Sequence, residues 1–195
     1  MTKAYLLSLC CLLIGVAQAQ TDTTIFNVLK KAENNEYVFS VPDKWTKLPQ
    51  IDNAAIDQKY EFTDVGLPHL VGNTPLTANF ILRKLECDSI NAAEDFIINE
   101  FTSYPDRITP AGYNYLTDSL QIASGEIATL LTTHYYRRSK VSNFTRYDLI
   151  AYSHKRKAAY MLTITFQYKD PTYMCEADLR MKRYATRVFK TLLLR

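Results

Sequence analysis

The stretch IATLLTTHYYRRSKVSNFTRYDLIAYSHKRKAAYMLTITFQY, residues 127–168, decides the fold. It contains three segments rich in Thr, Tyr, Ile and Leu, which favour strands. These segments are residues 127–136, 144–153 and 159–168. Only short turns separate them, and consecutive strands with such short connections pair antiparallel. The stretch therefore predicts an antiparallel meander.

Two helices are expected around this meander. The first follows Asn91, where Glu94 three residues later completes a capping-box pattern, and it ends before Pro105. The second closes the chain, because six apolar residues recur there at helical spacing. They are Met181, Tyr184, Ala185, Val188, Phe189 and Leu192.

Further strands are expected before the meander, at residues 37–41, 59–63, 77–85 and 113–122. Pro42 closes the first of them, and a turn then places the only tryptophan, Trp45. The order of strands, helix, meander and helix is typical of an α+β fold, with an antiparallel sheet packed between helices.

The first nineteen residues have the order of a secretory signal. Lys3 precedes an apolar run over residues 4–16, and Ala17-Gln18-Ala19 supplies the small residues that a signal peptidase requires. A lipoprotein signal ending at Cys10 or Cys11 is the alternative, although Leu9 stands where a small residue is needed. We expect an exported protein, periplasmic or secreted, with one domain over residues 20–195 and no transmembrane segment after signal removal.

The opening strand and turn, Tyr37-Val38-Phe39-Ser40-Val41-Pro42-Asp43-Lys44-Trp45, resemble those of the PsbP-like superfamily. The strand at 77–82 with its following helix resembles the middle of that fold, and the last strands and helix resemble its end. The resemblance covers residues 36–195 and implies a PsbP-like α+β fold. Members of this superfamily bind other macromolecules and share no common chemistry, so the resemblance implies a binding role.

No catalytic pattern is present. The chain has no Gly-x-Ser-x-Gly elbow and no glycine-rich phosphate loop. Its three histidines, His69, His134 and His154, have no partner at metal-ligand spacing. A metal site would require His134 and His154 to converge with Asp148 or Glu126. We expect no catalytic residue, no cofactor and no metal.

Two cysteines, Cys87 and Cys175, remain after signal removal, and export would place them in an oxidising compartment. Each lies at a junction between a strand and a helix. They can form a disulfide if both junctions share one end of the sheet, because the Cα atoms must approach within about 7 Å. Two separate thiols are the alternative.

Charge is divided along the chain. Residues 20–125 carry fifteen acidic and eight basic residues, whereas residues 126–195 carry five and fourteen. Two turns concentrate the basic residues: Arg137, Arg138 and Lys140 in one, and Lys155, Arg156 and Lys157 in the other. We expect these turns at opposite ends of the sheet, as solvated residues or as a surface for an anionic glycan, lipid or protein, and we expect no nucleic acid as partner.

These observations predict an exported, non-enzymatic binding or accessory module that acts through a protein or anionic-ligand surface. Its partner would be an envelope or extracellular protein or glycan. The alternative is an envelope hydrolase with a site assembled from distant loops. Converging titratable groups with shifted pKa values would favour the hydrolase, and an exposed apolar or tyrosine-rich patch would favour the binding module.

Overall fold

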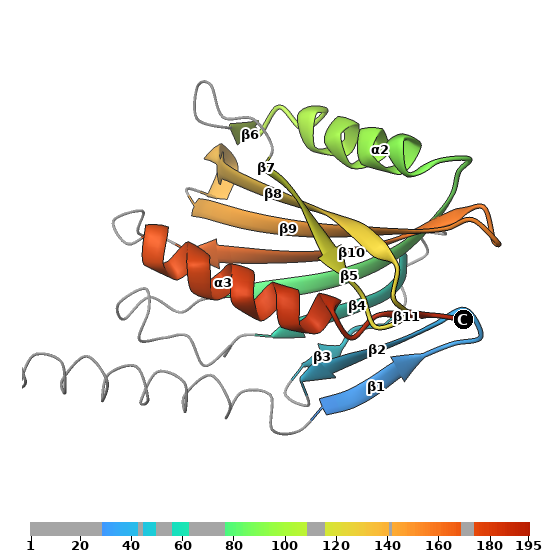
Figure 1. Cartoon of the computed structure of the whole chain (residues 1–195). Coiled ribbons are helices and arrows are strands. Elements are labelled where there is room, and N and C mark those ends of the chain that lie inside the picture. The colour runs from blue at the N-terminus through green and yellow to red at the C-terminus, as the bar shows by residue number, and fades with distance from the viewer. Residues whose placement is uncertain are drawn as a thin grey trace, which may run out of the picture.

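Three long strands form the centre of the sheet, as the short turns between them predict. The structure is a computed structural model that describes residues 29–42, 45–49, 56–62, 77–108, 116–140, 142–168 and 174–195. The central strands are β8 (Ile127–Arg137), β9 (Ser142–Ser153) and β10 (Ala158–Tyr168). They pair antiparallel in chain order, which confirms the meander (Figure 1).

Shorter strands extend the sheet on both sides. β5 (Thr77–Glu86) pairs with β10, and it is followed outward by β4 (Ile56–Phe62) and β3 (Thr46–Lys47). On the other side, β6 (Arg107–Ile108) and β7 (Leu116–Gln121) both pair with β8. A second sheet contains β1 (Leu29–Glu33), β2 (Tyr37–Pro42) and β11 (Leu193–Leu194). Every pairing between described strands is antiparallel.

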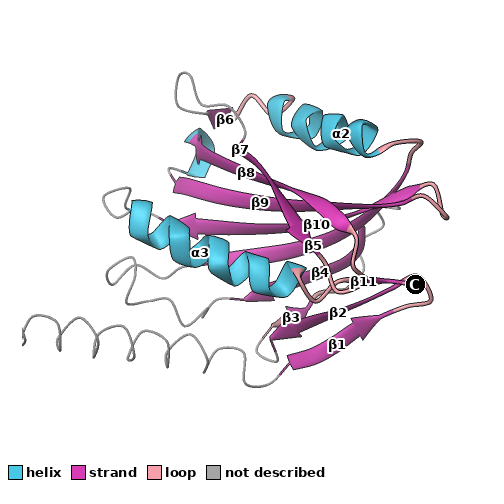
Figure 2. Cartoon of the chain, viewed as in Figure 1, coloured by secondary structure: helices cyan, strands magenta, loops and turns pink. Residues whose placement is uncertain are grey.

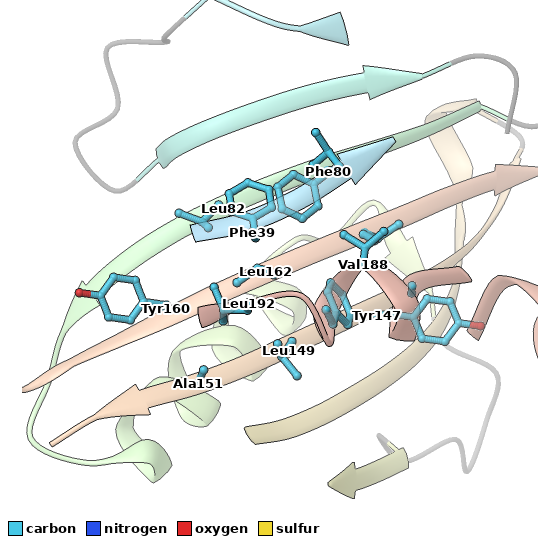
Figure 3. Packing of buried hydrophobic residues seen from close by; sticks show 14 of the residues in the cluster. Phe39, Phe80, Leu82, Tyr147, Leu149, Ala151, Tyr160, Leu162, Val188 and Leu192 are labelled. Carbon is cyan, nitrogen blue, oxygen red and sulfur yellow. The ribbon is translucent and has the colours of Figure 1, made fainter. Parts of the chain in front are cut away.

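Helix α3 (Met174–Phe189) covers one face of the large sheet. Alternate residues of β10 from Tyr160 to Phe166 point to this face and are buried, as are Tyr147 and Leu149 of β9 (Figure 3). The six apolar residues predicted to form the helix stripe are all buried: Met181, Tyr184, Ala185, Val188, Phe189 and Leu192. The helix is therefore docked through the stripe that its spacing predicts.

Strand β2 lies on the same face beside α3. The ring of Phe39 packs on Phe80 of β5 with centroids 5.2 Å apart. The Trp45 main-chain N–H donates to the Pro42 carbonyl at 3.1 Å, which confirms the turn between them. That turn inserts Trp45 into the core, where its indole N–H donates to the Tyr184 hydroxyl at 2.8 Å.

Helix α2 (Ile90–Thr102) covers the opposite face, so the two helices enclose the sheet (Figure 2). It buries Ala93, Ile97 and Phe101 at the spacing that the sequence predicts. Its start differs from the prediction: the cap is Ser89, whose hydroxyl accepts from the Ala92 N–H at 3.2 Å. The Asn91 capping box is wrong, because the helix already includes Ile90.

The predicted signal, residues 1–19, lies outside the described residues, and so do Gln20 and His69. Export and the extent of the domain stay predictions. Among the described helices, neither α2 nor α3 combines the length and the apolar character that crossing a membrane requires.

The docking of α3 predicts a large loss of stability for Phe189→Ala. Phe189 is completely buried, so truncation leaves a cavity and costs roughly 3–5 kcal/mol of the unfolding free energy. Urea denaturation would measure this loss. Arg183→Ala, on the exposed side of the same helix, should change the free energy little. Equal small losses for the two variants would show that the helix is not docked as described.

The observed cap predicts different effects for two neighbouring residues. Ser89→Ala removes the acceptor for the Ala92 N–H and should lower the unfolding free energy by about 1 kcal/mol. Asn91→Ala, at an exposed position inside the helix, should leave it unchanged or raise it slightly, because alanine favours helix. Urea denaturation of both variants tests the assignment. A larger loss of unfolding free energy for Asn91→Ala than for Ser89→Ala would show that Asn91 is the cap.

Candidate functional site

A network of charged side chains lies between α2 and the sheet. Glu100 of α2 accepts from Arg83 of β5 at 2.7 Å and from Arg146 of β9 at 3.2 Å. Arg146 also donates through Nε to Asp148 at 2.7 Å, and the Thr163 hydroxyl donates to Asp148 at 2.5 Å. We call Arg83, Glu100, Arg146 and Asp148 the ion network.

Strand alternation explains this arrangement. Arg146 and Asp148 are two residues apart on β9, so both point to the α2 face, whereas Tyr147 between them points to α3. Thr163 of β10 is the register partner of Asp148. One strand thus supplies an apolar side to the main core and a polar side beneath α2.

The arginines of the ion network keep the carboxyl group of Glu100 ionised. Burial opposes ionisation of Glu100, but the hydrogen bonds and charges of Arg83 and Arg146 outweigh it and hold the pKa of Glu100 below its ordinary value. Burial would likewise lower the pKa of Arg146, but the charges of Asp148 and Glu100 raise it instead. These groups form fixed ion pairs and are not tuned for proton transfer near neutral pH.

Arg107 of β6 lies beside the network against three aromatic rings. Its Cζ is 4.2 Å from the ring centroid of Tyr104 and 5.4 Å from those of Phe101 and Tyr135. Phe144 stacks on Tyr135 with centroids 4.9 Å apart. We call Arg107, Phe101, Tyr104 and Tyr135 the arginine–aromatic site. Within the described part of the chain, the buried Nε and Nη1 of Arg107 have no hydrogen-bond acceptor.

This site reaches the molecular surface. The side chain of Tyr104 is 45% exposed, and Phe96, two turns earlier along α2, is 36% exposed. Arg107 itself is half-buried. Tyr104 and Arg107 therefore lie at the molecular surface just after the C-terminal end of α2, and Phe96 is exposed within the helix itself.

The sequence did not single out this site. Its members come from α2, the segment after it, β6 and β8, and only the pairing of β6 with β8 brings Arg107 to Tyr135. The many tyrosines of the meander are expected mostly in the core, with an exposed row as the alternative, and Tyr135, Tyr147 and Tyr160 are indeed buried. The helical spacing predicts an apolar stripe on the first helix that includes Phe96 and Tyr104, but both side chains are exposed.

The two predicted basic turns lie at opposite ends of β9, as expected. Arg137 donates to Asp106 at 3.1 Å, and Arg156 donates to the main-chain oxygen of Arg195 at 3.0 Å. Both arginines thus connect segments of the chain. Arg138, Lys155 and Lys157 are exposed. The side chain of Lys140 lies outside the described part, and a role of either turn in binding stays a prediction.

The histidines do not converge. His134 is buried on β8, with Nδ1 2.8 Å from the Thr145 hydroxyl, whereas exposed His154 follows the far end of β9 and packs on Tyr152. The suggested metal site from these two histidines is therefore wrong. In the described ranges, no group of three or more His, Cys, Asp or Glu side chains is placed to hold a metal ion.

The predicted disulfide is not formed in this structure, where Cys87 is a free thiol. Cys87 lies beside Lys157, just before β10 begins, and its N–H donates to the Lys157 carbonyl at 3.1 Å. Cys175 belongs to the first turn of α3, which follows the other end of β10. The two junctions are at opposite ends of a strand about 33 Å long, so the shared end of the sheet that a disulfide requires is absent for these two junctions.

No family model matches the sequence, and no curated protein matches it either. The structure is similar to the Saccharomyces cerevisiae Ran-binding protein Mog1p, with a TM-score of 0.51, 11% identity, and coverage of 86% of this chain and 95% of that chain. The two chains share a fold. A mutant of Mog1 gives a TM-score of 0.53 with 10% identity, covering 86% and 96% of the two chains.

A weaker similarity is to LpqN, involved in cell envelope biogenesis of Mycobacterium tuberculosis. It has 17% identity, coverage of 86% of this chain and 90% of that chain, and a TM-score of 0.47, which is too low to carry an argument. At such identities the Mog1 similarity shows the fold alone.

The lowered pKa of Glu100 predicts acid-sensitive stability. A carboxyl group whose pKa is lower in the folded state stabilises the fold above its unfolded pKa, and this stability is lost as pH falls below the ordinary value of 4.5. Glu100→Gln should therefore cost about 1–3 kcal/mol at neutral pH and flatten the acid limb of the unfolding free energy. Asp95→Asn, on the exposed side of α2, is the control. An unchanged acid limb in Glu100→Gln would contradict the pairing.

Proposed function

We propose that this protein is an exported, non-enzymatic binding or accessory module of PsbP-like type. Its partner contacts the edge of the molecule that contains Phe96 and the arginine–aromatic site. The observation that carries this proposal is the half-exposed Tyr104 ring over the Arg107 guanidinium. Tyrosine and arginine are the residues most enriched where binding energy concentrates in protein interfaces.

The direction of the pKa shifts supports a non-enzymatic role. Hydrogen bonds and neighbouring charges lower the pKa of four described carboxyl groups: Glu36, Glu100, Asp106 and Asp118. A hydrolase needs a general acid or base with a pKa near the working pH. Each of these shifts moves the carboxyl group away from neutral pH, which favours the binding module over the hydrolase.

The shared fold supports the same choice. Mog1p is named as a Ran-binding protein, so this fold serves in at least one protein to bind another macromolecule. The export part of the proposal rests on the signal pattern of residues 1–19. We expect the mature chain to begin at Gln20, and the intact mass of the exported protein would test this.

Affinity capture from the native envelope tests the proposed edge. A partner held by the wild-type chain should be lost with Tyr104→Ala and reduced with Phe96→Ala, because both rings supply exposed contact area at this edge. Leu179→Ala is the matched control, since Leu179 is 52% exposed on α3, over the opposite face. If Leu179→Ala loses the partner and Tyr104→Ala keeps it, the interface lies on the α3 face instead. Turnover of an envelope ester or glycoside by the wild-type chain would refute the non-enzymatic role.

A further inference from the structure

Of Arg83, Arg107, Arg137 and Arg146, only Arg107 has no ion pair within the described part of the chain. Arg83 and Arg146 share Glu100, and Arg146 also pairs with Asp148. The neighbouring Arg137 pairs with Asp106. These pairs use all three carboxylates around the site. One positive charge therefore remains in excess, and it belongs to Arg107.

That charge is also partly removed from water. The three rings lie within 5.4 Å of its Cζ, and the enclosed Nε and Nη1 find no acceptor. This burial lowers the pKa of Arg107, despite the opposing effect of Tyr135. Aromatic faces recover part of the lost hydration, but a buried donor without an acceptor still costs free energy. Nη2 is not among these buried donors, and Arg107 as a whole is half-buried, so Nη2 is the nitrogen through which the site would bind a partner from outside.

We infer that Arg107 anchors a site for a single carboxylate, the side chain of an aspartate or glutamate in an acidic segment of a partner protein. The inference rests on the proposed function and specifies the chemistry of its partner. A guanidinium N–H donates a charge-assisted hydrogen bond to a carboxylate, which is stronger than one between neutral groups. The surrounding rings lower the local dielectric constant, which strengthens the attraction. The exposed ring of Tyr104 then offers its surface to an apolar neighbour of the bound carboxylate.

The charge balance favours a carboxylate over a polyanion. A phosphate monoester carries between about −1.5 and −2 charges at neutral pH, and a sulfated glycan or an anionic membrane surface requires several unpaired cations. Here Arg83, Arg137 and Arg146 are already paired, and the one excess charge among these groups matches one carboxylate. Arg138, at the nearby turn, is exposed to water, and in the described part of the chain no aromatic ring lies over its guanidinium, so it provides the matched control.

The test is an NMR titration of the full mature chain, following the arginine Nε–Hε signals. The probe is N-acetyl-glutamyl-leucine amide, and its glutaminyl analogue is the uncharged control. The Arg107 signal should shift and saturate with the glutamyl probe, and the analogue should bind at least about ten-fold more weakly, the loss of one charge-assisted hydrogen bond. Arg107→Gln should abolish the saturable response, and Arg138→Gln should preserve it.

Three results would overturn the inference. They are no saturable shift of Arg107, equal binding of the two dipeptides, and a response to inorganic phosphate as strong as that to the glutamyl probe. Thermal unfolding checks that Arg107→Gln is folded, and Arg107→Lys, which keeps the charge but loses the flat guanidinium that packs on the rings, should bind with intermediate strength. If the probe fails while Tyr104→Ala still loses the envelope partner, the carboxylate site is wrong and the proposed function stands.

Discussion

The burial of Arg146 is the constraint on which the α2 side of the molecule depends. A charge in that position is tolerated only with close and well-oriented partners. Asp148 on the same strand supplies one, and Glu100 supplies the other from α2. The helix is thus held by an ion pair at its C-terminal half, in addition to the apolar contacts of Ala93 and Ile97. This anchoring places the end of α2, and with it Tyr104, beside β6.

The two faces of the sheet differ in chemistry because neighbouring residues on one strand have opposite surroundings. The α3 face is apolar and packed with aromatic rings, including Phe39, Phe80 and Trp45. The α2 face combines a smaller apolar cluster with the ion network and with Arg107. A stable core on one side leaves the other side free to carry polar residues.

Much of the fold could be predicted from the sequence, because it depends on local periodicity. The strands of the meander, the α3 stripe and the turn before Trp45 each follow from residues close together in the chain. The cap of α2 was missed because Ser89 and Asn91 both fit a start signal, and only the main-chain geometry distinguishes them. Whether the disulfide could form was not predictable from the sequence, because the answer depends on which ends of β10 the two junctions occupy. The arginine–aromatic site depends on the pairing of β6 with β8. Because β6 contains only two residues, its sequence pattern does not predict this pairing.

The small sheet has a consequence for the biosynthesis of this chain. β2 is paired with β1 on one side and with β11 on the other, and β11 comes more than 150 residues later. The Arg195 N–H donates to the Glu36 carbonyl at 2.9 Å, and the Glu36 side chain accepts from Lys84 and from Tyr160. During synthesis from the N-terminus, the edge of β2 at Tyr37 and Val38 stays unpaired until the last residues emerge. Such long-range closure makes the final step of folding slow and leaves an aggregation-prone strand that a chaperone would have to shield.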